Sequence, residues 1–169
     1  MPSADSRLFV EQIVRRWMYK DVGEAISRMC NYLVALALTE YTEILGAHLR
    51  DKVGVPEEGR RNFDAFFGLM KQVNPEYDQF EKELASKATE PKKRSVYGVV
   101  RCGLAHEYFV KAKSNVENNP NDPKGECLSG PACGLYYDPN DPDRLTLNVN
   151  RYLHDFRLAV DQFESMLPP

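Results

Sequence analysis

One arginine and one histidine, set within an otherwise apolar stretch, are the residues of this chain best suited to chemistry. The stretch covers residues 96–113, VYGVVRCGLAHEYFVKAK, and the two residues are Arg101 and His106. A guanidinium donates paired hydrogen bonds to a phosphate or carboxylate, and an imidazole exchanges a proton near neutral pH. In a helix, residues five apart are separated by ~140° of rotation and ~7.5 Å of rise. The two side chains would therefore border one cleft only where this helix meets another helix, in particular one from a second copy of the chain.

The same two residues also have a structural interpretation. A buried arginine needs an anionic partner, and Glu40 or Glu43 of an earlier predicted helix would serve. A buried histidine is commonly satisfied by a backbone carbonyl. Gly98 and Gly103, on either side of the arginine, would let another backbone or a phosphate come close. Spacing alone does not decide between a catalytic pair and a structural pair.

Four further residues are candidates for binding a nucleic acid. Tyr108 lies on the arginine side of the predicted helix, where it would stack on a base, bond a phosphate or pack in the core. Lys92, Lys93 and Arg94 precede the apolar stretch and would attract phosphate locally, although such charges commonly serve solubility alone. The net charge of −3 gives the chain no general attraction to nucleic acid. Any phosphate binding must therefore come from a local patch of this kind.

The remaining residues with metal-binding or nucleophilic chemistry form no recognisable site. Cys127 and Cys133 lack a second close cysteine pair and neighbouring histidines, whereas a zinc site needs four ligands as a rule. Cys30 and Cys102 fall inside predicted helices, as is typical of buried free thiols. His48 and His154 are expected at the surface or at helix caps. We expect no metal and no cofactor, and the sequence shows no glycine-rich phosphate loop, paired catalytic carboxylates or serine-histidine-acid arrangement.

Length and composition indicate one globular domain spanning residues 1–169. Apolar residues make up 43% and charged residues 28% of the chain, close to globular averages. The N-terminus shows no signal peptide, and the longest apolar run, residues 32–38, is too short to span a bilayer. We therefore expect a soluble, cytoplasmic protein that does not insert in a membrane.

Apolar periodicity and stop signals predict an all-α fold, an antiparallel bundle of about five helices with a small β-hairpin before the C-terminal helix. The five longer predicted helices cover about 7–20, 24–50, 56–70, 96–113 and 150–167, and a short helix covers about 74–84. Asn74 is expected to cap the short helix. Residues 114–133, rich in Asn, Pro and Gly, are predicted to form a flexible loop. Residues 134–137 and 144–149 have strand character and form the predicted hairpin.

The segment RCGLAHEYF, residues 101–109, resembles the signature of the HEPN superfamily, in which an arginine is followed after four to six residues by a histidine. Members are all-helical bundles that carry this motif on a late helix, and the predicted order of helices here is similar. The resemblance implies that Arg101 and His106 are the functional pair. Cys102 departs from the pattern, because active members often have a polar residue such as asparagine at that position.

The resemblance further implies a metal-independent endoribonuclease that acts as a homodimer, with two motifs facing each other. The 2′-hydroxyl of RNA would attack the neighbouring phosphate, His106 would exchange the proton, and Arg101 would stabilise the charge of the transition state. The products would be a 2′,3′-cyclic phosphate and a 5′-hydroxyl. Related proteins often work in toxin-antitoxin or defence systems beside an antitoxin protein. The alternatives are a non-catalytic scaffold that binds RNA or protein, and a nucleotide-binding regulator.

Overall fold

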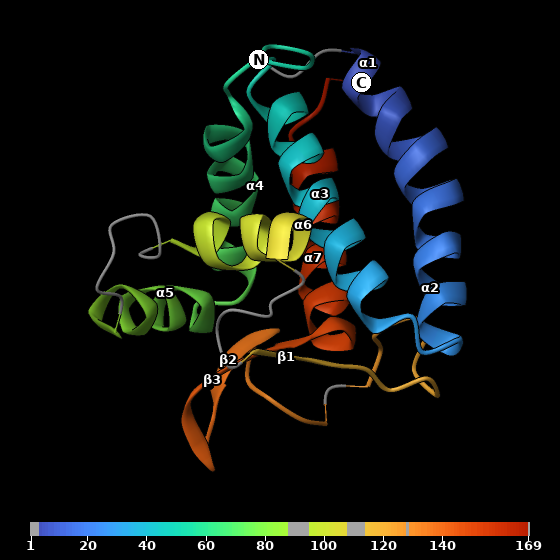
Figure 1. Cartoon of the computed structure of the whole chain (residues 1–169). Coiled ribbons are helices and arrows are strands. Elements are labelled where there is room, and N and C mark those ends of the chain that lie inside the picture. The colour runs from blue at the N-terminus through green and yellow to red at the C-terminus, as the bar shows by residue number, and fades with distance from the viewer. Residues whose placement is uncertain (1–3, 88–94, 108–113, 128, 169) are drawn as a thin grey trace.

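A long N-terminal helix forms one side of the molecule in the computed structural model, which describes residues 4–87, 95–107, 114–127 and 129–168 (Figure 1). It consists of α1 (Ala4–Leu8), a π-helical segment η1 (Phe9–Met18) and α2 (Tyr19–Ser27). Its buried side recurs at every fourth residue: Ser6, Val10, Val14, Met18, Val22 and Ile26. In a pure α-helix such a stripe drifts by ~40° at each step. The wider π turn in the middle offsets this drift and keeps the stripe on one face.

The N-terminal helix ends later than the sequence predicted. Gly23, expected in the break between the first two helices, lies within α2 instead. The chain turns at residues 28–30, where Met29 adopts a positive φ of 59°. The prediction was wrong because Ile26 continues the buried stripe, which favours helix beyond the glycine.

The next helix, α3 (Asn31–Leu49), lies at the centre of the bundle and contacts α2, α4 (Gly59–Val73) and α7 (Val149–Ser165). A Cβ added at Gly46 would lie 1.7 Å from the carbonyl oxygen of Asn62, so the backbones of α3 and α4 meet there. The fifth helix, α5 (Glu76–Lys87), follows a turn in which the side chain of Asn74 accepts a hydrogen bond from the Glu76 amide at 3.2 Å. That bond confirms the predicted cap.

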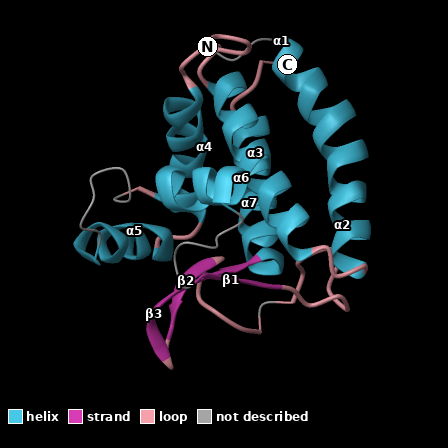
Figure 2. Cartoon of the chain, in the orientation of Figure 1, coloured by secondary structure: helices cyan, strands magenta, loops and turns pink. Residues whose placement is uncertain are grey.

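A three-stranded mixed sheet lies at one end of the bundle (Figure 2). It contains β1 (Ser114–Glu117), β2 (Leu135–Asp138) and β3 (Asp141–Asn148) in the order β1-β3-β2. Strands β2 and β3 are antiparallel, which confirms the hairpin. Strand β1 pairs with β3 in parallel, with Ser114 opposite Leu145.

The fold is therefore mostly helical rather than purely all-α. The prediction of a loop over 114–133 is corrected at its first four residues, which form β1. Val116 is the one buried residue of that strand, too little apolar patterning to reveal a strand in sequence. The motif helix, η3 (Tyr97–Arg101) and α6 (Cys102–Glu107), lies across α3 and α4 (Figure 1). No helix in the described ranges is long and apolar enough to cross a membrane.

Candidate functional site

The helix that carries the arginine and the histidine is fixed to the bundle along one side. Val96, Val100 and Leu104 are buried and again recur every four residues, and a π turn, η3, again lies among them. The hydroxyl of Ser95 accepts a hydrogen bond from the Gly98 amide at 3.2 Å and supports the start of the helix. Arg101, the last residue of the π segment, directly follows the buried Val100, and its side chain contacts α3.

The Arg101 guanidinium lies between two carboxylates of α3. Its Nη2 donates to Oε2 of Glu40 at 3.1 Å, and its Nε lies 2.8 Å from Oε2 of Glu43. The Arg101 Nε and the Glu43 Oε2 are sealed from solvent, and their contact is an ion pair without hydrogen-bond alignment. Burial alone lowers the pKa of Arg101, but the charges of Glu40 and Glu43 outweigh it and raise the pKa above its ordinary value. The guanidinium therefore stays charged.

Glu43 also joins this cluster to α4. A Cβ added at Gly59, the first residue of α4, would lie 2.7 Å from Oε1 of Glu43 and 3.0 Å from the Tyr97 hydroxyl. The positive end of the α4 dipole favours a carboxylate at this place. The Tyr97 ring centre lies 5.6 Å from Cζ of Arg101, and burial, with the charge of Glu43, raises the pKa of Tyr97. Three helices thus meet around one ion pair.

His106 differs from Arg101 in its surroundings. Its side chain is exposed on α6, whereas the arginine is half-buried against α3. The predicted alternative of an arginine paired with Glu40 or Glu43 is confirmed, and both glutamates take part. The predicted alternative of a core histidine at position 106 is wrong. The structure therefore brings the arginine to the glutamates of α3 and leaves the imidazole facing solvent.

The other predicted binding residues are not placed. Tyr108, Lys92, Lys93 and Arg94 lie outside the described residues. Gly103 has open space beyond its Cα, since a Cβ there would meet nothing within 4 Å. Close packing against the described part of this chain therefore does not require a glycine at that position.

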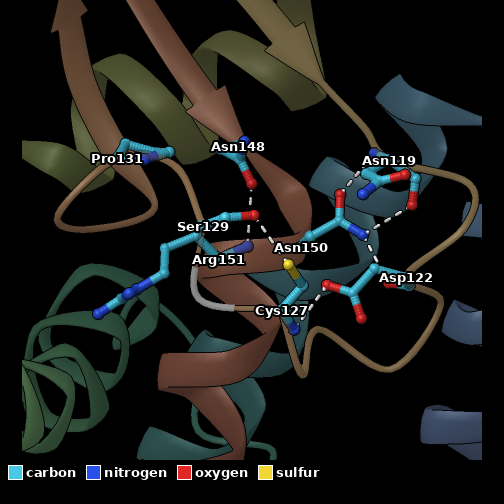
Figure 3. Close-up of a pocket in the computed structure, with 8 residues that line it drawn as sticks. All are labelled: Asn119, Asp122, Cys127, Ser129, Pro131, Asn148, Asn150 and Arg151. Atoms are coloured by element: carbon cyan, nitrogen blue, oxygen red, sulfur yellow. Dashed lines mark hydrogen bonds between the residues drawn. The ribbon is translucent and has the colours of Figure 1, made fainter.

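A polar pocket at the start of α7 was missed by the sequence reasoning (Figure 3). Its cavity volume is about 40 Å³, and it is lined by Asn119, Asp122, Cys127, Ser129, Pro131, Asn148, Asn150 and Arg151. The side-chain oxygen of Asn150 accepts a hydrogen bond from the backbone N–H of Asn119 at 2.7 Å. Its side-chain nitrogen donates to the backbone carbonyls of Asn119 at 3.0 Å and Asp122 at 2.6 Å. The Asp122 carboxylate accepts from the amides of Glu126 and Cys127. These bonds order the segment between β1 and β2, and its repeated Asn and Asp residues were the available signal.

All four cysteines are free thiols, and Cys30 and Cys102 are less buried than expected. Cys30 is exposed rather than buried, because it lies in the turn that ends the N-terminal helix. Cys127 is exposed, and a hydrogen bond at 2.8 Å to the Ser129 hydroxyl lowers its pKa. Cys133 is buried, which raises its pKa to about 11. Cys102 is half-buried beside Arg101.

His48, expected at the surface or as a cap, is buried. Its ring stacks on Phe9 with 4.2 Å between centroids, and its Nδ1 lies 3.2 Å from the Ser6 hydroxyl. Burial lowers the pKa of His48, and the charge of Asp5 opposes this effect. The position follows from the turn at residues 28–30, which folds the N-terminal helix back along α3.

Within the described part of the chain, no group of three or more His, Cys, Asp or Glu side chains is close enough to hold a metal ion. Models of known protein families, curated proteins and solved structures were each compared with this chain, and none of the three comparisons found a match.

Proposed function

We propose that this protein cleaves RNA without a metal ion, at a site formed by Arg101 and His106. The observation that carries the proposal is an exposed imidazole five residues after a guanidinium that two carboxylates keep charged. The HEPN-like spacing of the two residues supports the same assignment. An exposed imidazole is accessible to a large substrate, as a polynucleotide requires.

The two residues have complementary roles in this proposal. The RNA 2′-hydroxyl attacks the adjacent phosphorus, and the bond to the 5′-oxygen breaks. His106 accepts the proton of the 2′-hydroxyl or donates one to the leaving 5′-oxygen. Arg101 donates hydrogen bonds to the phosphoryl oxygens, where negative charge accumulates in the transition state. A 2′,3′-cyclic phosphate and a 5′-hydroxyl result.

A homodimer would supply two imidazoles, one as the base and the other as the acid. Leu33, Glu40 and Ile44 lie within about 40° of one another around α3, seven and four residues apart. Leu33 and Ile44 are 62% and 39% exposed. Exposed apolar residues on both sides of the glutamate that binds Arg101 favour a protein contact beside the motif helix.

The test is cleavage of an end-labelled single-stranded RNA in excess EDTA. We expect fragments that end in a 2′,3′-cyclic phosphate, and no cleavage at positions that carry a 2′-deoxyribose. Cleavage that needs a divalent ion, or that proceeds at 2′-deoxy positions, would contradict the proposed chemistry.

A second candidate is a non-catalytic helical module that binds RNA or protein. It is favoured by the two ion pairs of Arg101, which give the arginine a structural role, and by the excess of carboxylates around it. The same EDTA experiment separates the candidates, because a module would bind RNA, or a partner protein, and leave RNA intact.

A further inference from the structure

We propose that the two glutamates paired with Arg101 have opposite effects on RNA binding: Glu43 holds the guanidinium in place, and Glu40 competes with the RNA phosphate for it. This inference rests on the proposed function, since it assigns Arg101 to a phosphodiester. It adds a positioning residue and an inhibitory contact to that site.

The contact of Arg101 with Glu43 is more buried than its contact with Glu40. The Glu43 side chain is 20% exposed, and the atoms that form its ion pair, Arg101 Nε and Glu43 Oε2, are sealed from solvent. The Glu40 side chain is 36% exposed, and its hydrogen bond reaches Nη2, at the end of the guanidinium. An ion pair screened from water is stronger and exchanges partners less readily than one at the surface. Glu40 is therefore the partner that an incoming anion displaces.

Glu43 is enclosed by two helices besides its own. Its Oε1 lies 2.7 Å from where a Cβ of Gly59 would be, at the start of α4, and the Tyr97 hydroxyl lies 3.0 Å from the same point. A carboxylate enclosed in this way has less freedom to move than one at the surface. It orients the guanidinium toward the surface, where Glu40 and a phosphate oxygen would accept from the same Nη2 donor.

The same replacement is therefore expected to change RNA affinity in opposite directions at these two residues of α3. Replacement of Glu40 with glutamine removes a negative charge that repels the phosphate and weakens the competing bond. The same replacement of Glu43 removes the charge that holds the guanidinium in position. A purely structural role for the cluster predicts that both replacements weaken RNA binding or leave it unchanged.

The experiment measures the affinity of a fluorescein-labelled 2′-O-methyl RNA, which binds without being cleaved, by fluorescence anisotropy. We expect Glu40→Gln to tighten binding about fivefold and Glu43→Gln to weaken it about fivefold, as for one charge near a phosphate. Glu164→Gln is the matched control, because this glutamate pairs with Arg15 in a separate cluster. It should change the affinity by less than about twofold.

A double variant identifies the residue through which Glu40 acts. If Glu40 competes for Arg101, the tightening caused by Glu40→Gln disappears in an Arg101→Gln background. Circular dichroism and thermal unfolding establish that each variant is folded. Where Glu43→Gln does not fold, the comparison of Glu40→Gln with and without Arg101→Gln decides alone.

The outcomes separate the inference from the proposed function. Wild-type protein that neither binds nor cleaves RNA refutes the proposed function and the inference together. Wild-type protein that cleaves RNA, with a Glu40→Gln variant that binds equally or more weakly, refutes the inference only. Tightening that persists without Arg101 also refutes the inference.

Discussion

Two arginines in this protein each pair with two carboxylates of a neighbouring helix, but the two ion-pair clusters lie in different surroundings. Arg15 on η1 contacts Asp161 and Glu164 of α7, and Arg101 on η3 contacts Glu40 and Glu43 of α3. In both clusters the carboxylates are three residues apart on one helix, the arginine is in a π-helical segment, and a tyrosine lies four residues away along the arginine's helix.

The clusters differ in depth and in what lies next to them. The Arg15 side chain is 38% exposed and the Arg101 side chain 17%. The Arg15 cluster joins two helices at the surface. The Arg101 cluster lies where three helices meet, and an exposed histidine follows on the same helix. The same ion-pair pattern therefore acts as a surface clamp in one place and, in our proposal, positions a phosphate-binding group in the other.

The largest expected difference between the clusters is in stability. Arg101→Ala should lower the free energy of unfolding by about 2–3 kcal/mol, because it leaves two neighbouring carboxylates without their cation in a half-buried place. Arg15→Ala should lower it by less than about 1 kcal/mol, because the side chains of Arg15 and Asp161 are well exposed to solvent. Urea unfolding measures both values. Equal losses in the free energy of unfolding would show that the two clusters stabilise the fold equally.

A second prediction concerns the buried His48 and the pH dependence of stability. The lowered pKa of His48 means that the folded state binds a proton less readily than the unfolded state. Stability should therefore fall as the pH decreases through about 6.5, the ordinary value for histidine, and stay constant above it. His48→Gln should flatten this dependence between about pH 7 and about pH 5.5. A steeper slope in the His48 variant would contradict the burial effect.

The smallest expected effect is that of salt. The Arg15 cluster is exposed enough for screening, so the stability lost in Arg15→Ala should shrink by a few tenths of a kcal/mol between about 0.05 M and about 1 M NaCl. The loss in Arg101→Ala should change less, since its innermost atoms are sealed. Thermal unfolding at both salt concentrations measures the change. A larger salt effect at Arg101 would contradict the conclusion that the Arg101 cluster is more buried than the Arg15 cluster.

Local patterns in the sequence predicted much of this fold. The cap at Asn74, the hairpin of β2 and β3, and Glu40 or Glu43 as partners of Arg101 all followed from neighbouring residues or from helix faces. The parallel strand β1 did not, because it pairs with residues about thirty positions later and has little apolar patterning of its own.

The errors at the N-terminus have a similar cause. The turn at Met29 and the burial of His48 depend on how the first helix folds back along α3, a long-range contact that no local spacing reveals. For the candidate site, residue types and spacing identified the two candidate residues and predicted that they lie on different faces of their helix. The depth of Arg101 and the exposure of His106 required the structure.

The most direct test of the central claim is the rate of RNA cleavage in EDTA by His106→Ala, with Arg15→Ala as the control that disturbs only the surface cluster. The proposed chemistry predicts that His106→Ala loses at least about 100-fold in rate with unchanged unfolding stability, while Arg15→Ala retains the wild-type rate. An active wild-type protein whose rate is unaffected by the loss of His106 would contradict the account.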